Sequence, residues 1–231
     1  MRFAVIGATH GLGLALTKTL LDEGHKVAAG TLDREVPDTL KPLIEQYGDN
    51  ILVGRADVTN EEEIKAFAKS TAAFFGKVDA VCTVAGIMLP EDRKLSLLEA
   101  EISNLRTTFD VNFIGPVTVA KYFYPIIEKG GKLLTITSEG VGVRYAWSGS
   151  PHYALSKTAV TKVAGILNST VDDVDFYSVH PGRPMTLMNR NGEIPAEESA
   201  AGIFKIMAGQ TPVSREAWYI DYLGNSMVNQ W

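Results

Sequence analysis

The stretch Phe3-Ala4-Val5-Ile6-Gly7-Ala8-Thr9-His10-Gly11-Leu12-Gly13 decides how this chain folds. Phe3 to Ile6 is short, apolar and partly β-branched, which is typical of a buried strand. The segment from Leu12 to Glu23 has a helical pattern, and Gly24 is a natural stop for it. The glycines between the two elements permit a tight turn and let a pyrophosphate approach the N–H groups at a helix N-terminus. Glycines alone could reflect tight strand–helix packing, but a strand, a glycine loop and a helix in this order predict a dinucleotide site.

The alternation of strand and helix patterns continues through the chain. Further strands are predicted at Val27–Gly30, Ile51–Gly54, Val78–Val84, Lys132–Thr137, Asp175–Val179 and Trp218–Asp221, and helices at Pro37–Tyr47, Asn60–Phe75, Glu99–Glu128, Pro151–Asn168 and Ala196–Met207. We expect Pro116 to bend or split the long helix, and Ser150 to cap the helix that carries Pro151 at its first position. The strands are almost continuously apolar, as expected when both sheet faces are covered. The sequence therefore predicts an α/β protein: one domain over residues 1–231 with a Rossmann fold, a doubly wound parallel sheet of about seven strands and helices on both faces.

Composition narrows the classes of function. The chain has 231 residues, of which 45% are hydrophobic and 21% are charged, and this suits one large globular domain. A formal net charge of -5 gives no support to nucleic-acid binding. One cysteine, Cys82, excludes an intrachain disulfide and fits a reducing, cytoplasmic compartment. We see no leader peptide and no apolar run of the ~20 residues that a membrane span needs, and four scattered histidines predict no metal site. The expected partner is therefore a small molecule, with neither nucleic acid nor membrane.

The pair Tyr153 and Lys157 points to proton chemistry. Residues four apart lie one turn from each other on the same face of a helix, so an ammonium is held near a phenol. A free phenol has a pKa near ~10, and a nearby positive charge lowers it toward neutral pH. Ser138, 15 residues earlier, follows a predicted strand and could hydrogen-bond the same substrate oxygen. Each residue alone is more often an ordinary surface or turn residue, but together on this topology they predict a proton-transfer site for a hydroxyl or carbonyl.

These motifs, in this order, resemble the short-chain dehydrogenase/reductase family over essentially the whole chain. The glycine spacing Gly-x-x-x-Gly-x-Gly is that of the family, and the small C-factor-like carbonyl reductases within it have a similar length and ending. The resemblance implies catalytic roles for Asn112, Ser138, Tyr153 and Lys157. It implies cofactor contacts from Gly7, Thr9, His10, Gly11, Leu12, Gly13, Thr31, Arg34, Asp57, Val58, Ala85, Gly86, Tyr153, Lys157, Pro181, Gly182 and Thr186. The family's Asn-Asn-Ala-Gly motif is here Thr83-Val84-Ala85-Gly86, so a hydrogen bond that braces the sheet centre should be lost.

The second strand decides between NAD(H) and NADP(H). A carboxylate at its end would bind the ribose 2′-hydroxyl and repel a 2′-phosphate. By resemblance this position falls on Thr31, which is neutral, and His10 and Arg34 could face a phosphate. We therefore expect NADP(H) more than NAD(H), although Asp33 could supply the carboxylate if the loop is shifted.

The expected activity is hydride transfer between a nicotinamide and a carbonyl or secondary alcohol. Tyr153 would exchange the proton, Ser138 would hold the oxygen, Lys157 would lower the tyrosine pKa and grip the nicotinamide ribose, and Asn112 would hold a water that relays protons. The alternative is a catalytically weak dinucleotide sensor or signalling protein on the same fold. A sugar-nucleotide epimerase shares the Tyr-x-x-x-Lys pair, but only ~50 residues follow Pro181, too few for its substrate domain.

Two further expectations concern the walls of the substrate site and the contact between subunits. The irregular stretch Pro181–Pro195 leaves a strand's carboxyl end and is expected to line the substrate site together with Glu139–Gly149. Arg144, Trp147 and Met185 are candidate substrate-wall residues. Related enzymes pair through two helices that would be Leu105–Glu128 and Pro151–Asn168, so a homodimer or homotetramer is expected.

Overall fold

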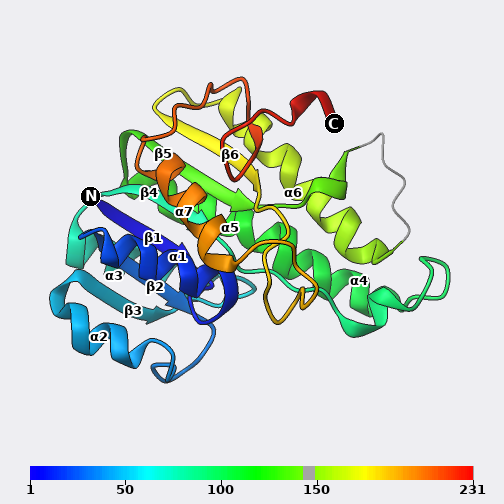
Figure 1. Cartoon of the computed structure of the whole chain (residues 1–231), viewed down its shortest axis with the longest axis horizontal. Helices are drawn as coiled ribbons and strands as arrows, with labels where there is room; N and C mark the ends of the chain where they lie inside the picture. Colours follow the sequence, from blue (N-terminus) through cyan, green and yellow to red (C-terminus); the bar gives the residue numbers. More distant parts are fainter. Residues whose placement is uncertain (143–148, 231) are drawn as a thin grey trace.

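The computed structural model describes residues 1–142 and 149–230. Its seven strands form one sheet in the order β3-β2-β1-β4-β5-β6-β7, and every pairing of neighbours is parallel (Figure 1). The strands are β1 (Arg2–Ile6), β2 (Lys26–Thr31), β3 (Ile51–Arg55), β4 (Val78–Thr83), β5 (Ile127–Ile136), β6 (Val174–His180) and β7 (Tyr219–Asp221). The helices are α1 (Gly11–Asp22), α2 (Lys41–Tyr47), α3 (Glu61–Phe75), α4 (Ile102–Phe109), α5 (Gly115–Phe123), α6 (Pro151–Asn168) and α7 (Ala196–Met207). The predicted fold class is confirmed.

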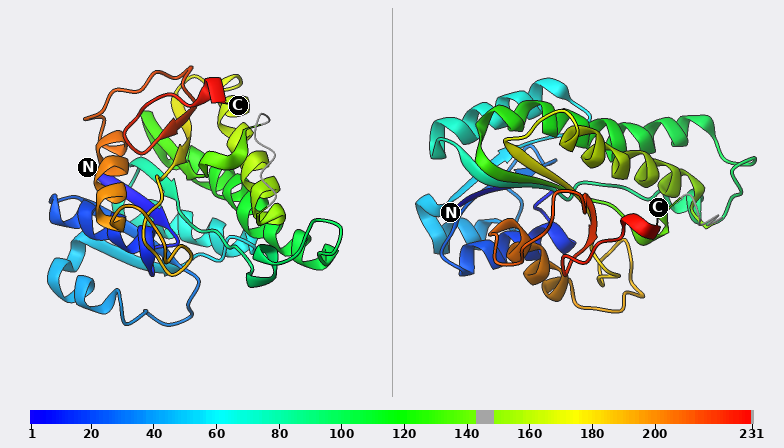
Figure 2. Two further views of the ribbon diagram at one scale, coloured as in Figure 1. Left: turned by 45° about the vertical axis from the view of Figure 1, so that its right-hand side comes forward. Right: turned by 90° about the horizontal axis from the view of Figure 1, so that it is seen from above.

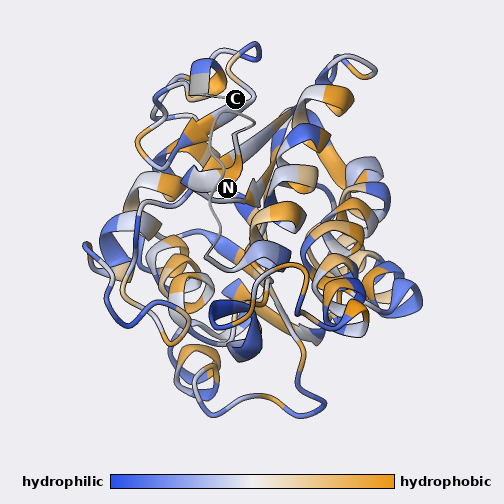
Figure 3. Ribbon diagram, turned by 90° about the vertical axis from the view of Figure 1, so that its right-hand side faces the viewer, coloured by the Kyte–Doolittle hydropathy of each residue, from blue (hydrophilic) through white to orange (hydrophobic). Residues whose placement is uncertain are grey.

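The helices cover both faces of the sheet. One apolar core lies between the sheet and α1, α2 and α7, and contains Leu16, Leu20 and Phe204. The other lies under α3, α5 and α6, and contains Phe67 and Phe123. The view from above in Figure 2 shows the two helix layers on opposite sides of the strands, and the helices in Figure 3 alternate between hydrophobic and hydrophilic residues. The apolar stripe of each helix is therefore what fixes it to the sheet.

The strand order reverses between β1 and β4, and this point positions the site. The chain proceeds outward from β1 to β3 and then crosses to β4 on the other side of β1. The loops that leave the two central strands must diverge here, so a crevice opens at their carboxyl ends. Beside it, Cys82 of β4 is completely buried, and burial raises the pKa of its thiol.

The predicted elements are present, with shifted ends where prolines act. The helix expected from Pro37 begins at Lys41, because Pro42 suits only a first helical turn. The long helix expected to reach Glu128 is split as predicted, with Pro116 in the first turn of α5. Its end was predicted wrongly: Pro125 stops the helix, and β5 begins at Ile127 rather than Lys132.

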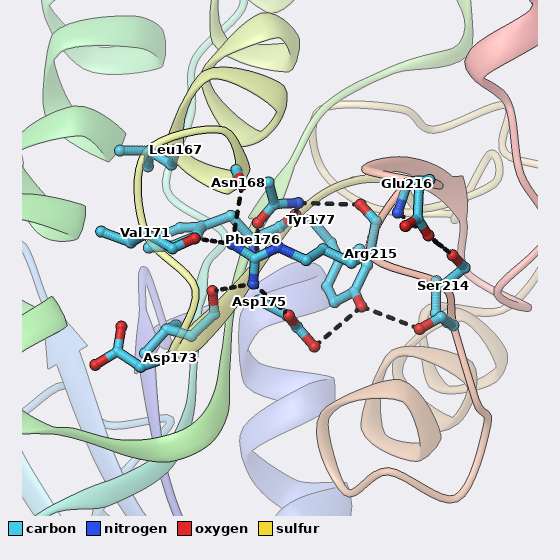
Figure 4. Close-up of polar contacts among 12 residues, drawn as sticks. Leu167, Asn168, Val171, Asp173, Asp175, Phe176, Tyr177, Ser214, Arg215 and Glu216 are labelled. Atoms are coloured by element: carbon cyan, nitrogen blue, oxygen red, sulfur yellow. Dashed lines mark hydrogen bonds and ion pairs between the residues drawn. The ribbon is translucent and has the colours of Figure 1, made fainter.

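Arg215 ties the connection between α6 and β6 to the segment that leads into β7 (Figure 4). Its Nη1 donates to the Val174 carbonyl at 3.0 Å and to Asp175 Oδ1 at 2.8 Å. Its Nη2 donates to the carbonyls of Asn168, at 3.0 Å, and Val171. One guanidinium thus satisfies the carbonyl of Asn168, which ends α6 and has no intrahelical partner, and those of Val171, after the helix, and Val174, at the start of β6. None of the helices in the part of the chain that the structure describes is long and apolar enough to cross a membrane.

Candidate active site

The glycine loop has the backbone conformation that close approach to a phosphate requires. Gly7 has φ +92, and its N–H donates to the Gly30 carbonyl at 2.9 Å. A Cβ at Gly13 would lie 2.0 Å from the Gly7 carbonyl oxygen, so only glycine allows α1 to begin this close to β1. No side chain caps the N-terminus of α1 at His10. The first N–H groups of α1 are therefore available to an anion, and the loop fits a pyrophosphate.

Tyr153 and Lys157 project from one face of α6, as their spacing predicts. The Lys157 Nζ lies 5.7 Å from the centroid of the Tyr153 ring and donates to the Ile136 carbonyl at 2.7 Å. A Cβ added to Gly86 would lie 3.3 Å from that Nζ, so the amine reaches the backbone that follows β4. Lys157 is 3% exposed, so the carbonyl of Ile136 is what compensates for removing an ammonium from water.

The pKa values of this pair differ from the expected pattern. Burial raises the pKa of Tyr153 to about 12, and the cation that works against this rise is Arg93. Burial also lowers the pKa of Lys157 to about 8. Burial is the largest influence on the pKa of Tyr153, and Arg93 rather than Lys157 is the cation that opposes it, so the lowering expected from Lys157 is not found in this structure. At neutral pH the phenol keeps its proton.

Ser138 follows the end of β5, where the chain turns away from the sheet. Its carbonyl accepts a hydrogen bond from Tyr219 Oη at 2.8 Å, so β7 holds the serine backbone from the far side. Tyr219 is completely buried, which makes this support rigid. Ser138 and Tyr153 line the same cavity, as the predicted catalytic set requires.

Asn112 lies behind the cavity wall rather than on it. It belongs to a π-helical turn, Asp110–Ile114, inserted between α4 and α5. Its Oδ1 accepts from the Ile87 N–H at 2.8 Å, and its Nδ2 donates to the Ile87 carbonyl at 2.8 Å and to Ser156 Oγ at 3.0 Å. The side chain thus joins α6 to the segment after β4. A π-helical turn inside a helix often marks a functional site.

The N-terminus of α6 is capped by a residue that the sequence does not reveal. Ser150 was predicted to cap it, but its side chain does not do so, and its backbone is left-handed with φ +66. Instead, Asp92 accepts the N–H groups of His152 and Tyr153, each at 2.9 Å, one on each carboxylate oxygen. Asp92 is 2% exposed and lies in the η2 turn, Pro90–Arg93. A buried carboxylate at a helix N-terminus satisfies two N–H groups and complements the helix dipole.

One cavity of about 850 Å³ brings most of the predicted residues together. Its volume is near the upper end of ligand pockets. The predicted residues that line it are Gly7, Thr9, His10, Gly11, Leu12, Asp57, Val58, Ala85, Gly86, Ser138, Tyr153, Lys157, Pro181, Gly182 and Thr186. Those that do not line it are Gly13, Thr31, Arg34 and Asn112. Gly13 acts instead through packing, and Arg34 is exposed.

The predicted substrate wall is partly correct. Glu139 and Gly140 line the cavity, and so do Leu187 and Met188 of the Pro181–Pro195 stretch. Met185 does not line it and is 49% exposed, and its N–H donates to the Ile194 carbonyl at 2.8 Å. Arg144 and Trp147 lie outside the described residues.

Several cavity residues carry no recognisable sequence motif. His180 ends β6, and its Nε2 lies 3.8 Å from Glu139 Oε2. Burial lowers the pKa of His180, while Glu139 works in the opposite direction. Arg93 and Met88 follow β4 and also reach the cavity. The sequence alone does not indicate that Arg93 and Met88 line the cavity, because this depends on where the irregular segment after β4 lies in space.

The end of β2 holds a carboxylate close to the glycine loop. Thr31 Oγ1 donates to Asp33 Oδ2 at 2.9 Å and lies 2.9 Å from Thr9 Oγ1. The Asp33 N–H returns to Thr31 Oγ1 at 3.1 Å. The loop therefore folds so that Asp33, rather than Thr31, offers a negative charge at this point. In the motif after β4, Thr83 Oγ1 is buried and has no hydrogen-bond partner among the described residues, as expected from the loss of the family's asparagine.

Comparisons with a family model and with known proteins point to the same family. A family model described as enoyl-(acyl carrier protein) reductase, of the short-chain dehydrogenase type, matches residues 7–219. An uncharacterized oxidoreductase of Schizosaccharomyces pombe is 31% identical over 190 residues, which cover 80% of this chain and 72% of the relative.

Two solved structures share the fold over nearly the whole chain. A short-chain dehydrogenase/reductase from Burkholderia multivorans with bound NADP has a TM-score of 0.85, with 21% identity, and covers 100% of this chain and 99% of its own. A carbonyl reductase from Pseudomonas aeruginosa has a TM-score of 0.81, with 20% identity, and covers 98% and 99%. The chain thus belongs to the short-chain dehydrogenase/reductase family and is an NAD(P)-dependent oxidoreductase.

Proposed function

We propose that the chain interconverts a carbonyl compound and the corresponding secondary or primary alcohol at a site formed by Ser138, Tyr153 and Lys157. The observation that best supports this is that the three residues line the same cavity as the glycine loop. A proton donor and the phosphate-binding backbone therefore share one space, so a substrate and a dinucleotide can be oriented together.

Tyr153 is the proton donor in the direction of reduction. Because its pKa is raised to about 12, it remains a neutral phenol and can give its proton to the oxygen that becomes an alkoxide. Ser138 donates a second hydrogen bond to the same oxygen and holds its developing charge. The nicotinamide supplies the hydride when it is bound. Lys157, whose amine already reaches the backbone at Gly86, grips the ribose next to it.

Asn112 acts by positioning. Its three side-chain hydrogen bonds hold Ile87, which lines the cavity, against Ser156 of α6. The proton relay through a water at Asn112 stays a prediction, since the side chain is already committed to protein groups.

The proposed cofactor is NADP(H), with NAD(H) as a weaker second. His10 lines the cavity beside the glycine loop, and Arg34 is exposed three residues after β2, so both can meet a 2′-phosphate. The Asp33 carboxylate works against this choice, because it repels the phosphate and accepts hydrogen bonds from a ribose 2′-hydroxyl. We therefore infer a modest preference rather than strict selectivity.

The experiment that tests the proposed function is the Tyr153→Phe variant. It removes one oxygen and leaves the ring, so the fold and NADPH binding should be kept while turnover falls by about 100-fold or more. Oxidation of NADPH is measured with a panel of aldehydes, ketones and quinones, and NADPH binding is measured by fluorescence. Tyr122→Phe is the matched control, because Tyr122 Oη donates to Glu61 at 2.7 Å and the residue does not line the cavity. Full turnover by Tyr153→Phe would contradict the proposal.

We also propose a homodimer or homotetramer that pairs through α5 and α6. Val117 on α5 and Leu155 and Ile166 on α6 remain exposed, and an interface would remove them from water. Measurement of the mass in solution checks this. A cytoplasmic location stays a prediction, supported by a single buried cysteine.

A further inference from the structure

Arg93 is placed at the catalytic tyrosine by a rigid anchor. Arg93 is the last residue of the η2 turn. Asp92, the residue before it, accepts hydrogen bonds from the N–H groups of His152 and Tyr153 in the first turn of α6. The turn that carries Arg93 and the helix that carries Tyr153 are therefore fixed to each other by two hydrogen bonds. Arg93 lines the cavity with Tyr153 and Ser138, and its charge is close enough to lower the pKa of the phenol against the effect of burial.

The charge of Arg93 is not neutralised by the protein. Its Nη2 donates to the Met188 carbonyl at 2.6 Å, and no ion pair joins it to a carboxylate among residues 1–142 and 149–230. The other charged groups that line the cavity have different partners, and among them Asp57 Oδ1 accepts from the N–H and the hydroxyl of Thr59, at 2.9 and 2.7 Å. Arg183 is paired with Glu193 at 3.1 Å, Lys157 donates to Ile136, and Glu139 faces His180. A guanidinium has five N–H donors in a planar fork, so most of those of Arg93 are left for water or for an anion.

Apolar side chains line the cavity on the two segments that Arg93 joins. Met88, Leu187 and Met188 line the cavity on the same segments, after β4 and in the Pro181–Pro195 stretch. A ligand that fits this arrangement has an oxygen for Tyr153 and Ser138, an anionic group for Arg93, and a hydrocarbon part for the apolar side chains. Bidentate contact with a guanidinium is the usual way in which proteins recognise a carboxylate.

We propose that Arg93 is a specificity-determining residue, and that the enzyme acts on oxo acids, in which a carboxylate lies a few carbons from the carbonyl. This inference rests on the proposed function and names its substrate class. In reduction, the π bond of the ketone breaks, a C–H bond forms with the nicotinamide hydride, and an O–H bond forms with the Tyr153 proton. The product is a hydroxy acid, and the carboxylate keeps its charge throughout.

Paired substrates provide the test. Aliphatic 2-, 3- and 4-oxo acids are compared with their methyl esters, which differ in charge but keep the same carbonyl. In the wild-type enzyme, kcat/KM for the best acid should exceed that of its ester by about 10- to 100-fold. Arg93→Gln should abolish this ratio mainly by raising KM for the acid, and Arg93→Lys should restore part of it. Arg190→Gln, which removes an exposed charge of the Pro181–Pro195 stretch outside the cavity, should leave the ratio unchanged.

Two results would overturn the inference. The first is an ester turned over as well as its acid by the wild-type enzyme. The second is an equal loss for acid and ester in Arg93→Gln, which would reduce Arg93 to a structural tie to Met188. Binding is measured separately, by calorimetry of each oxo acid against the Tyr153→Phe enzyme with NADPH. Here the acid should bind and Arg93→Gln should weaken it, even if Tyr153 proves not to be the proton donor. Absence of any acid binding to this complex would also refute the role of Arg93.

Discussion

The carboxylate of Asp92 holds Tyr153 by its backbone N–H, at 2.9 Å, from 61 residues away in the sequence. The other carboxylate oxygen takes the N–H of His152 at the same distance. The first turn of α6 is thus fixed at the point where the proton donor leaves the helix. Asp92 is buried, so the loss of these two hydrogen bonds is costly.

Asp92→Ala should lower both stability and turnover. Two buried N–H groups lose their acceptors, so the free energy of unfolding should fall by about 1–3 kcal/mol. Turnover at saturating NADPH should fall about tenfold or more, because a small displacement of Tyr153 is enough to misalign it, while the Kd for NADPH stays near the wild-type value. Chemical denaturation and steady-state kinetics measure the two effects. Asn60→Ala is the control, since it removes the cap of α3 outside the cavity and should cost stability without a comparable loss of turnover.

Stability should depend on pH through Lys157. Burial lowers its pKa to about 8, below the ordinary value near ~10.4, so the folded protein disfavours the charged form. This cost is complete below pH 8 and disappears as the pH rises past the unfolded pKa. Relative to Lys157→Met, the wild-type protein should gain about 1 kcal/mol of stability between pH 7 and pH 9, and about 2 kcal/mol by pH 10. Urea unfolding of both proteins over this range measures the difference, and parallel curves would show that Lys157 titrates normally.

Cofactor selectivity should respond to Asp33. Asp33→Asn removes a negative charge next to the proposed 2′-phosphate position, so the Kd for NADPH should fall by about five- to tenfold. The Kd for NADH should rise, because a carboxylate accepts a ribose hydroxyl better than an amide does. Fluorescence titration with both nucleotides measures this. Asp38→Asn is the control, since Asp38 is 94% exposed and pairs with Lys41. Tighter binding of NADH than NADPH by the wild-type protein would reverse the proposed preference.

Most of the fold and part of the site could be predicted from short-range sequence patterns. The spacing of Tyr153 and Lys157 is read directly from one helix turn, and the conformations of Gly7 and Gly13 follow from a tight strand–helix junction. Alternating apolar segments indicated a parallel sheet, because a strand buried on both faces has no polar side. The end of the long helix was misplaced where Pro125 overrode a helical pattern.

Contacts between distant segments could not be predicted. Asp92 and His152 are far apart in the chain, and neither residue type nor spacing indicates that one caps the helix of the other. The same holds for Arg93 and Met188, whose contact depends on how two irregular segments meet at the carboxyl ends of β4 and β6. The pKa of Tyr153 was misjudged for a related reason, since spacing shows the neighbouring cation but does not show how deeply the phenol is desolvated.

The burial of Cys82 gives this protein an internal reporter. A thiol at the middle of the sheet, with a raised pKa, cannot form the thiolate that alkylating reagents attack, so the native enzyme should keep its activity in iodoacetamide. The sulfur becomes reactive only when the central strands separate. Incorporation of the label, followed by mass spectrometry, should therefore count molecules that have passed through global unfolding, at one modification per chain.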